Sequence, residues 1–275
     1  MNLPNRSIER TFTLFSCALS IFSTAAAQDI CTPYVEQTVQ PVKPNVLWKQ
    51  LANVPTVKSE YETTAAFEAR VASTMSKIAS PVVVEVPVQG KYITYDADSS
   101  RLNVQGYAFA NERTEYSGVF GYGSPLYQKI KYGYSDNIDV VFPYEEAQVG
   151  SYVGTTAMGV KIRVTKVRRF TRVLFEREGK LAEGLFPGLS QHDAPVITFS
   201  NVTPEMAKHM KATFRAAILY TPKPPYFAKG KYPWGEPTIE GPMDIDETIE
   251  VAIGDIQCAL LLNSDGKVYG ATATR

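Results

Sequence analysis

Strand-forming runs dominate the chain after Pro81, and this pattern constrains the fold more than any other feature. Runs rich in β-branched and aromatic residues separated by turn residues are typical of β-strands. They lie at residues 82–88, 91–95, 102–110, 137–142, 152–166, 170–177, 195–200 and 216–220, with two more within 247–269. Asn263-Ser264-Asp265-Gly266 predicts a hairpin turn between the last two. Strands and helices do not alternate regularly, so the sequence predicts an α+β fold with a mainly antiparallel sheet.

Two short amphipathic helices are expected beside this sheet, at about 64–79 and 204–214. The first carries an apolar stripe at helical spacing, formed by Phe67, Val71, Met75 and Ile78. Thr63 or Thr64 can cap its N-terminus, because a hydroxyl oxygen accepts a hydrogen bond from a free backbone N–H of the first turn. The second helix opens with Thr203-Pro204-Glu205, which places a cap, a proline and an acid in the preferred order.

The charged stretch that precedes the first helix, Ser59 to Arg70 (SEYETTAAFEAR), has two interpretations. Three glutamates and an arginine within twelve residues resemble part of a catalytic site. Acids before a helix are also stabilised by its dipole, and an aromatic residue there can pack on the first turn as a hydrophobic staple. The second interpretation predicts a helix that begins within two residues of Thr64, with Tyr61 packed near Phe67.

The N-terminus predicts export. Residues 1–11 are polar and carry two arginines, residues 12–24 are apolar, and three alanines end at Ala27, which is the pattern of a secretory signal peptide. The apolar run is too short for a transmembrane helix, which needs about 20 residues. We expect cleavage near Ala27 and a periplasmic or secreted mature chain without a transmembrane segment. Lipid attachment at Cys17 is the alternative.

The remaining chain is divided into an extended lead-in at 28–58 and a single α+β domain at 59–275, with a sub-boundary near 180–195 as an alternative. The lead-in is expected to dock through Val46, Leu47, Trp48 and Leu51. The 28 basic and 28 acidic residues of the chain balance. A neutral chain lacks the basic excess of a nucleic-acid-binding protein, so we expect no nucleic-acid partner.

Cys31 and Cys258 are the two cysteines that follow the predicted cleavage point. Two cysteines in an oxidising compartment favour a structural disulfide. The alternative is a redox-active or nucleophilic thiol.

Motifs for catalysis are weak. Ser190, His192 and Asp193 are the residue types of a hydrolase triad, but neighbours on one short loop seldom converge as a triad requires. A periplasmic or secreted hydrolase that uses these residues is therefore kept as the alternative function, and no catalytic residue is assigned. Two histidines without ligand spacing predict no metal site and no cofactor. Acidic residues of 244–250 form either a weak cation site or a solvated strand edge.

A proline-rich segment at 221–242 is the best candidate for binding. It is expected to be a long loop that presents four aromatic residues, Tyr226, Phe227, Tyr232 and Trp234. Such rings suit a sugar or a protein partner, so a cell-envelope glycan or protein is the expected partner. The tyrosine-rich segment 116–144 is a second candidate surface. Alternatively, the loop covers a sheet edge and its rings are buried.

Two blocks of sequence, Glu60 to Arg70 and Gly150 to Val160 followed by Val164-Thr165-Lys166, resemble uncharacterised secreted and periplasmic proteins of bacteria. The first block reads as an acid, an aromatic residue, Glu-Thr, and then Phe-Glu-x-Arg. The resemblance implies a bacterial envelope protein of unknown function and supplies no catalytic residues. The expected function is accordingly that of an exported, non-catalytic binding or accessory protein.

Overall fold

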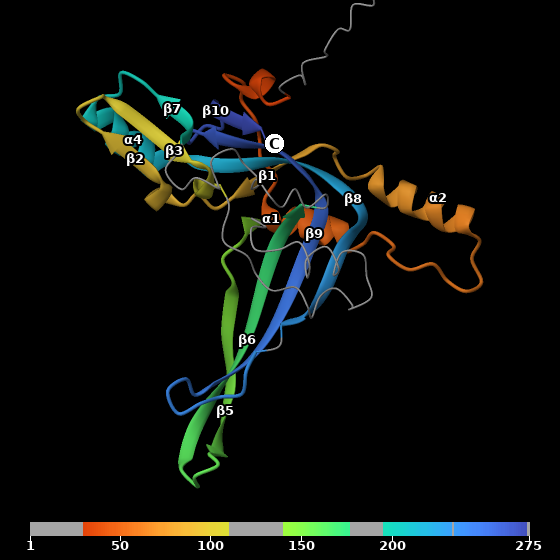
Figure 1. Ribbon diagram of the computed structural model, residues 1–275. Coiled ribbons are helices and arrows are strands. Elements are labelled where there is room, and N and C mark those ends of the chain that lie inside the picture. The colour runs from red at the N-terminus through yellow and green to blue at the C-terminus, as the bar shows by residue number, and fades with distance from the viewer. Residues whose placement is uncertain (1–29, 110–139, 177–194, 233, 274–275) are drawn as a thin grey trace, which may run out of the picture.

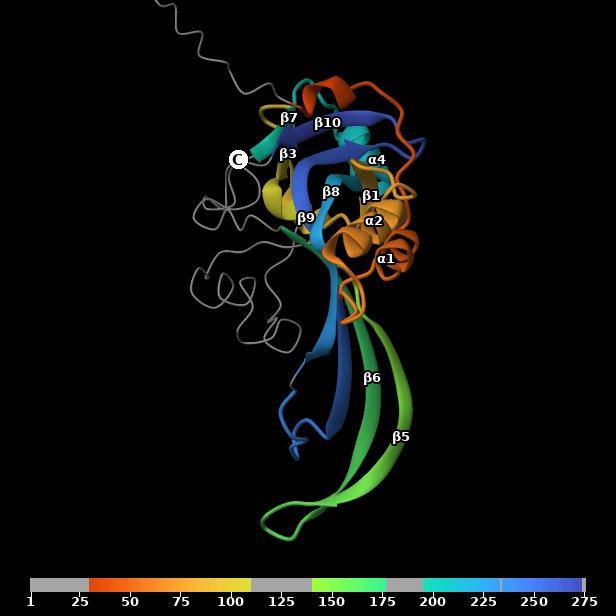
Figure 2. The same ribbon diagram turned by 90° about the vertical axis from the view of Figure 1, so that its right-hand side faces the viewer.

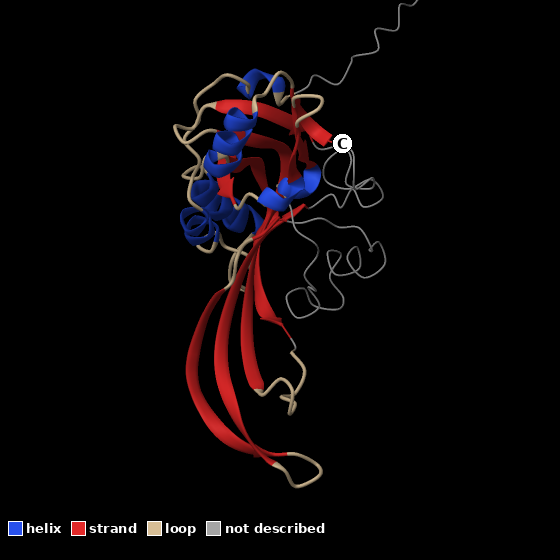
Figure 3. Cartoon of the chain, turned by 90° about the vertical axis from the view of Figure 1, so that its left-hand side faces the viewer, coloured by secondary structure: helices blue, strands red, loops and turns tan. Residues whose placement is uncertain are grey.

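The computed structural model describes residues 30–109, 140–176, 195–232 and 234–273. Figure 1 shows a head, which contains the helices, and a long curved arm that extends from it. The arm consists of β5 (Glu145–Thr155) and β6 (Lys161–Glu176), drawn in green, and the ends of β8 (Arg215–Tyr232) and β9 (Met243–Leu262), drawn in blue. A view at right angles shows the same curvature (Figure 2). No helix of the arm is visible in Figure 3, where every helix lies in the head.

A seven-stranded sheet runs through both head and arm. Its central path is β1-β8-β9-β6-β4, with β10 paired to β9 and β5 paired to β6. The strands are β1 Val82–Val86, β4 Val140–Val141, β5 Glu145–Thr155, β6 Lys161–Glu176, β8 Arg215–Tyr232, β9 Met243–Leu262 and β10 Val268–Ala273. All pairs are antiparallel except β6 with β9. A second, antiparallel sheet contains β2 Ile93–Asp96, β3 Arg101–Gln105 and β7 Pro195–Phe199.

The expected mixture of helices with a mainly antiparallel sheet is confirmed, and the predicted helix starts are confirmed too. Helix α2 spans Thr64–Met75, and the Thr63 hydroxyl accepts a hydrogen bond of 3.2 Å from the backbone N–H of Ala66. Helix α4 spans Pro204–Thr213, and Thr203 caps it in the same way. Both starts were predictable because a capping hydroxyl acts within one turn of its own position.

The expected count of two helices is wrong, because the lead-in is not extended throughout. Helix α1 spans Pro44–Leu51 and buries Leu47, Trp48 and Leu51. Proline at the first helical position is compatible with a helix, since that N–H has no intrahelical partner. The helix is only eight residues long, and its one-sided packing depends on the sheet beneath it. Short 3-10 turns at Thr32–Tyr34, Gly90–Tyr92 and Gly106–Ala108 complete the described helical elements.

The main hydrophobic core lies in the head. It is formed by α1, the head portion of the seven-stranded sheet and the three-stranded sheet. Trp48 is 2% exposed, and its ring meets Phe142 edge-on at 5.1 Å between centroids. The indole N–H of Trp48 also donates to the backbone oxygen of Glu250 at 3.1 Å. Trp48 therefore attaches the N-terminal segment to the central strand β9.

The stretch 59–70 is a helix start, but its charges do pair. Tyr61 is 92% exposed, so the predicted staple with Phe67 is wrong. The Arg70 guanidinium instead donates to both carboxylate oxygens of Glu62, at 3.1 and 2.8 Å, and lies 5.5 Å from the centre of the Phe67 ring. The hydrogen bond from Arg70 lowers the pKa of Glu62. Side chains eight residues apart meet because Glu62 lies before the helix and not on it.

A hairpin near residue 158 contradicts the predicted strand at 152–166. The chain reverses at 156–160, where the backbone N–H of Thr156 donates to the oxygen of Val160 at 2.9 Å. Gly159 has φ +80°, which glycine adopts without steric cost. β6 then continues through Arg168 and Arg169, where a turn was expected. Met158, an apolar residue within this turn, is 92% exposed.

The proline-rich segment is also not a loop over most of its length. β8 continues to Tyr232 and pairs with β9 on both sides of a bulge between Pro222 and Phe227. The bulge is where Pro224 and Pro225 lie, so the prolines interrupt the ladder at one point and do not end the strand. Of the described residues in this segment, only 234–242 lie outside regular structure.

The disulfide between Cys31 and Cys258 is confirmed, with 5.7 Å between the Cα atoms. It links the segment before α1 to β9. Beside it, this segment runs along β10, where the N–H of Val268 donates to Gln37 at 2.8 Å and the N–H of Val39 donates to Gly266 at 2.9 Å. Within the described ranges, no helix is long and apolar enough to cross a membrane.

Glu85 connects α1 with the sheet and gives the fold a predictable acid sensitivity. Its carboxylate is bonded to Lys43 at 2.5 Å and to Arg215 at 2.9 Å. Burial raises the pKa of Glu85, but the hydrogen bonds from Lys43 and Arg215 outweigh that effect, so the pKa lies below the ordinary value of a glutamate. A depressed folded-state pKa gives stability that is present above the unfolded pKa and is lost as the pH falls through the folded value.

We therefore expect Glu85→Gln to lower the free energy of unfolding by about 1 kcal/mol at pH 7, because these partners are partly solvated. The difference from wild type should shrink towards pH 3, as measured by urea unfolding at several pH values. Glu240→Gln, at an exposed position, is the control and should follow wild type. If the difference in free energy of unfolding between wild type and Glu85→Gln stays constant from pH 7 to pH 3, the ionised Glu85 carboxylate is not the source of the stability.

Candidate functional site

Two hollows contain residues of the predicted aromatic set, one in the head and one on the arm. We call the first the helix groove; it lies between α2 and the bend in β8. We call the second the arm cleft; it lies between the β5–β6 hairpin and the segment that follows β8. Tyr226 lines the helix groove and Trp234 lines the arm cleft. The predicted single aromatic surface is thus divided between two places.

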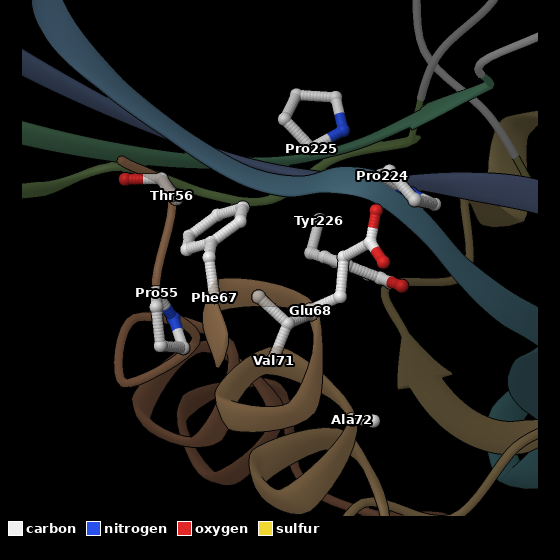
Figure 4. Close-up of a pocket in the computed structure, with 9 residues that line it drawn as sticks. All are labelled: Pro55, Thr56, Phe67, Glu68, Val71, Ala72, Pro224, Pro225 and Tyr226. Atoms are coloured by element: carbon white, nitrogen blue, oxygen red, sulfur yellow. The ribbon is translucent and has the colours of Figure 1, made fainter. Parts of the chain in front are cut away.

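The helix groove has a volume of about 460 Å³ and is mostly apolar (Figure 4). It is lined by Pro55, Thr56, Phe67, Glu68, Val71, Ala72, Pro224, Pro225 and Tyr226. Figure 4 shows the Phe67, Glu68 and Val71 side chains rising from α2 towards the β8 bend. No residue of α2 is buried, although Phe67 and Val71 form its apolar stripe. Because few polar atoms line this groove, it suits an apolar group.

Tyr226 has a φ of +67°, in the left-handed region that bulky residues rarely adopt. Such a conformation costs of order 1–3 kcal/mol and persists only where the surrounding structure holds it. Both Tyr226 and Phe227 are half-buried and pack against the main core. For these two rings, the alternative in which the segment covers the sheet describes the structure better than an exposed surface does.

The arm cleft has a volume of about 450 Å³. Ile162 and Val164 of β6 and Tyr152 of β5 contribute from the hairpin, while Trp234, Glu236 and Asp244 contribute from the chain between β8 and β9. Its other lining residues are Gly154, Thr155, Thr156, Gly235, Pro237 and Ile245. The cleft therefore combines two aromatic rings with two carboxylates, the hydroxyl groups of Tyr152 and of two threonines, and aliphatic side chains.

Trp234 is fixed in place although 43% of its surface is exposed. Its indole N–H donates to Glu247 at 2.6 Å. Glu247 is only 6% exposed, and the Thr171 hydroxyl donates to its other carboxylate oxygen. The Arg169 guanidinium lies 4.9 Å from the centre of the Trp234 ring. A ring held by these contacts loses little rotational freedom when a ligand packs on it.

The same arginine belongs to a wider network on the arm. Arg169 lies 4.3 Å from the centre of the Tyr144 ring and forms an ion pair with Glu146 at 2.8 Å. Cation–π contacts of this kind contribute about 0.5–1 kcal/mol at exposed sites. They extend the support of Trp234 across β6 to the outer strand β5.

Tyr152 lies near two carboxylates of the cleft. Desolvation raises the pKa of its hydroxyl, and the nearby Asp244 and Glu236 raise it further. Tyr152 therefore stays neutral. Lys166 lies 5.3 Å from the centre of its ring.

Other predicted site residues are accounted for as follows. Tyr232 ends β8 and lies between the two hollows in sequence. The candidates Ser190, His192 and Asp193, the boundary region up to residue 194, and most of segment 116–144 lie outside the described residues. Among the residues that are described, no group of three or more His, Cys, Asp or Glu side chains is placed to hold a metal ion.

The acidic residues of 244–250 lie partly on an edge. β9 pairs with β6 throughout this range, but with β8 only from Glu247 onwards. Asp246 pairs with Lys231, and Glu250 pairs with Lys229 at 3.0 Å. Cross-strand ion pairs therefore account for these two carboxylates, and Glu247 on the same strand supports Trp234.

Sequence reasoning missed Tyr152, Glu247 and Arg169 as parts of one site. They lie on three different strands, and their convergence depends on the parallel register of β6 with β9, which pairs Arg169 with Glu247. The one local signal was the block Gly150–Val160, which was noted for its resemblance and not for its position beside Trp234.

Comparisons with known proteins return nothing for this chain. No family model matches it, no curated protein is significantly similar, and no solved structure has a significantly similar fold.

Proposed function

We propose that this chain is an exported, non-catalytic binding protein of the bacterial cell envelope, and that it holds a glycan in the arm cleft. The observation that carries the proposal is the Trp234 ring, which is 43% exposed yet hydrogen-bonded to the buried Glu247. A large exposed aromatic surface that is held rigid is suited to ligand contact and contributes nothing to a core.

The chemistry of the cleft fits a sugar better than a purely apolar ligand. One face of a pyranose ring presents C–H groups that pack on an aromatic ring, and its hydroxyl groups donate to acceptors such as carboxylates. Trp234 and Tyr152 supply the rings, and Asp244 and Glu236 supply the acceptors. The two carboxylates disfavour an anionic ligand, so a neutral or cationic glycan is expected.

Export is part of the proposal and rests on two observations. The first is the signal-like pattern at residues 1–27. The second is the Cys31–Cys258 disulfide, since such bonds persist in oxidising compartments. The resemblance to secreted and periplasmic bacterial proteins agrees with both.

Isothermal titration calorimetry with a panel of neutral and amino-sugar oligosaccharides and peptidoglycan fragments tests the binding. We expect Trp234→Ala to weaken the affinity at least about tenfold, which corresponds to about 1.4 kcal/mol. Asp244→Asn should weaken it less, because the amide retains one acceptor oxygen. Ile239→Ala is the control, because Ile239 is exposed in the same segment but does not line the cleft.

Two results would overturn the proposal. Absence of binding across the whole panel excludes a glycan ligand, and binding that Trp234→Ala leaves unchanged excludes this cleft. Chromatography of the bound oligosaccharides after incubation distinguishes the hydrolase alternative, because shortened products would show that the protein is an enzyme.

A further inference from the structure

In the described part of the chain, the outer strand of the arm, β5, is paired on one side only. It is eleven residues long and pairs with β6 along its length. Among the strands that the structure describes, none pairs with its other side. Figure 2 shows β5 as the outermost strand of the arm. An unpaired strand presents a row of N–H and C=O groups that can pair with another chain.

Other edges of the seven-stranded sheet are covered or charged over part of their length. Beside β1, Val42 pairs with the strand through its N–H to Val83 at 2.8 Å and its oxygen to Glu85 at 3.0 Å. At the start of β10, the segment around Thr38 pairs with Lys267 and Val268. The arm portion of β8 carries Lys229 and Lys231, and lysine is a common protection for an edge.

β5 has little protection of this kind. Residues 147–155 contain no charged residue and no proline. Val149 and Val153 are 51% and 61% exposed. The single irregularity is a bulge between Gln148 and Gly150, so the six residues that follow it form a regular, uncharged strand. A free edge with these properties is unusual for a chain that stays monomeric.

We propose that β5 pairs with β5 of a second copy of this chain, antiparallel and across a two-fold axis, so that the two arms form one continuous sheet. The hairpin determines which backbone N–H and C=O groups of β5 point away from β6 and can bond a second copy. Because Thr156 is hydrogen-bonded to Val160, the alternation of an antiparallel ladder directs the N–H and C=O of Ser151, Val153 and Thr155 away from β6.

Those three residues fix the register. Two copies form hydrogen bonds only where such residues face each other, and placing Val153 on the axis sets Ser151 opposite Thr155 of the second copy. This register gives about six backbone hydrogen bonds. It also sets the exposed Val153 side chains against each other and forms two Ser–Thr pairs, which are favourable cross-strand neighbours.

Charge favours the antiparallel arrangement over a parallel one. The base of β5 carries Glu145 and Glu146, and the hairpin tip beyond it carries Lys161 and Arg163 on β6. Glu145 and Glu146 already pair with Arg172 and Arg169 of their own chain, so the basic tip carries the charge that decides the arrangement. Antiparallel pairing keeps the two basic tips apart, whereas parallel pairing sets them side by side. An antiparallel second copy therefore suits this edge in both hydrogen bonding and charge.

Sedimentation equilibrium of the purified, disulfide-bonded protein tests the pairing. We expect a dimer for wild type and at least a tenfold weaker association for Val153→Lys, which sets two like charges opposite each other on the axis. Met158→Lys is the matched control. It adds the same charge to the same hairpin, at a turn residue that is 92% exposed and lies outside the paired region.

A cysteine scan tests the register itself. Val153→Cys should form a covalent dimer on mild oxidation, visible on a non-reducing gel, because the two cysteines would face each other. Ser151→Cys should not, because its neighbour is Thr155. A wild-type monomer would overturn the proposal, as would a Val153→Lys protein that dimerises normally or equal cross-linking at both positions. The outcome is independent of glycan binding, since calorimetry on the monomeric variant still measures the cleft.

Discussion

Replacing both Cys31 and Cys258 with alanine is expected to lower the free energy of unfolding by roughly 4–5 kcal/mol. The bond spans 227 residues, and in the chain-entropy model so long a loop greatly restricts the unfolded chain. Both residues are buried, at 1% and 0% exposure, and they contact the small cluster formed by β8, β9 and β10. A separation of 5.7 Å between the Cα atoms is ordinary for a disulfide. Urea unfolding at pH 7 measures the effect.

The control is wild-type protein unfolded in the presence of a reductant, which should approach the stability of the double variant. If the reduced wild type and the double variant have the same free energy of unfolding, the lost stability is due to the covalent bond and not to the deleted sulfur atoms. A double variant with the wild-type midpoint and slope would show that the N-terminal segment is held by its backbone hydrogen bonds alone.

The second large effect is expected for Trp48→Ala, which should cost about 3–5 kcal/mol. The substitution leaves a cavity where the ring met Phe142 and removes the N–H that bonds the oxygen of Glu250. Val46→Ala on the same helix is the matched control. Val46 is 45% exposed, so its change should stay within about 0.5 kcal/mol. If the two variants unfold alike, α1 is not part of the cooperative core.

Features that depend on a few adjacent residues could be predicted from the sequence. The starts of α2 and α4 follow from capping threonines, and the turn between β9 and β10 follows from Asn263-Ser264-Asp265-Gly266. The Cys31–Cys258 bond followed from the compartment and from the number of cysteines. The caps and the turn depend on a few adjacent residues, and two cysteines allow a single pairing. None of these predictions therefore needed knowledge of distant packing.

Features that depend on pairing between distant residues were not predictable. The helix α1 is stabilised by the sheet it covers, and the prolines of β8 are tolerated because they fall at a bulge opposite β9. The arm cleft brings Tyr152 beside Trp234 through the register of three strands. Alternating patterns identify strands, but they do not say which strand lies beside which.

The parallel pairing of β6 with β9 has a consequence for the order in which the molecule forms. Thr165 pairs with Met243, and the chain between them builds β7, α4 and β8 before it returns. Contacts between residues so far apart form slowly, because the loop must close before any of them is gained. The β5–β6 hairpin is local and can form early, but β6 has no neighbour on its inner side until β9 arrives. The arm is therefore among the last parts to be completed, although its outer hairpin is encoded in the middle of the chain.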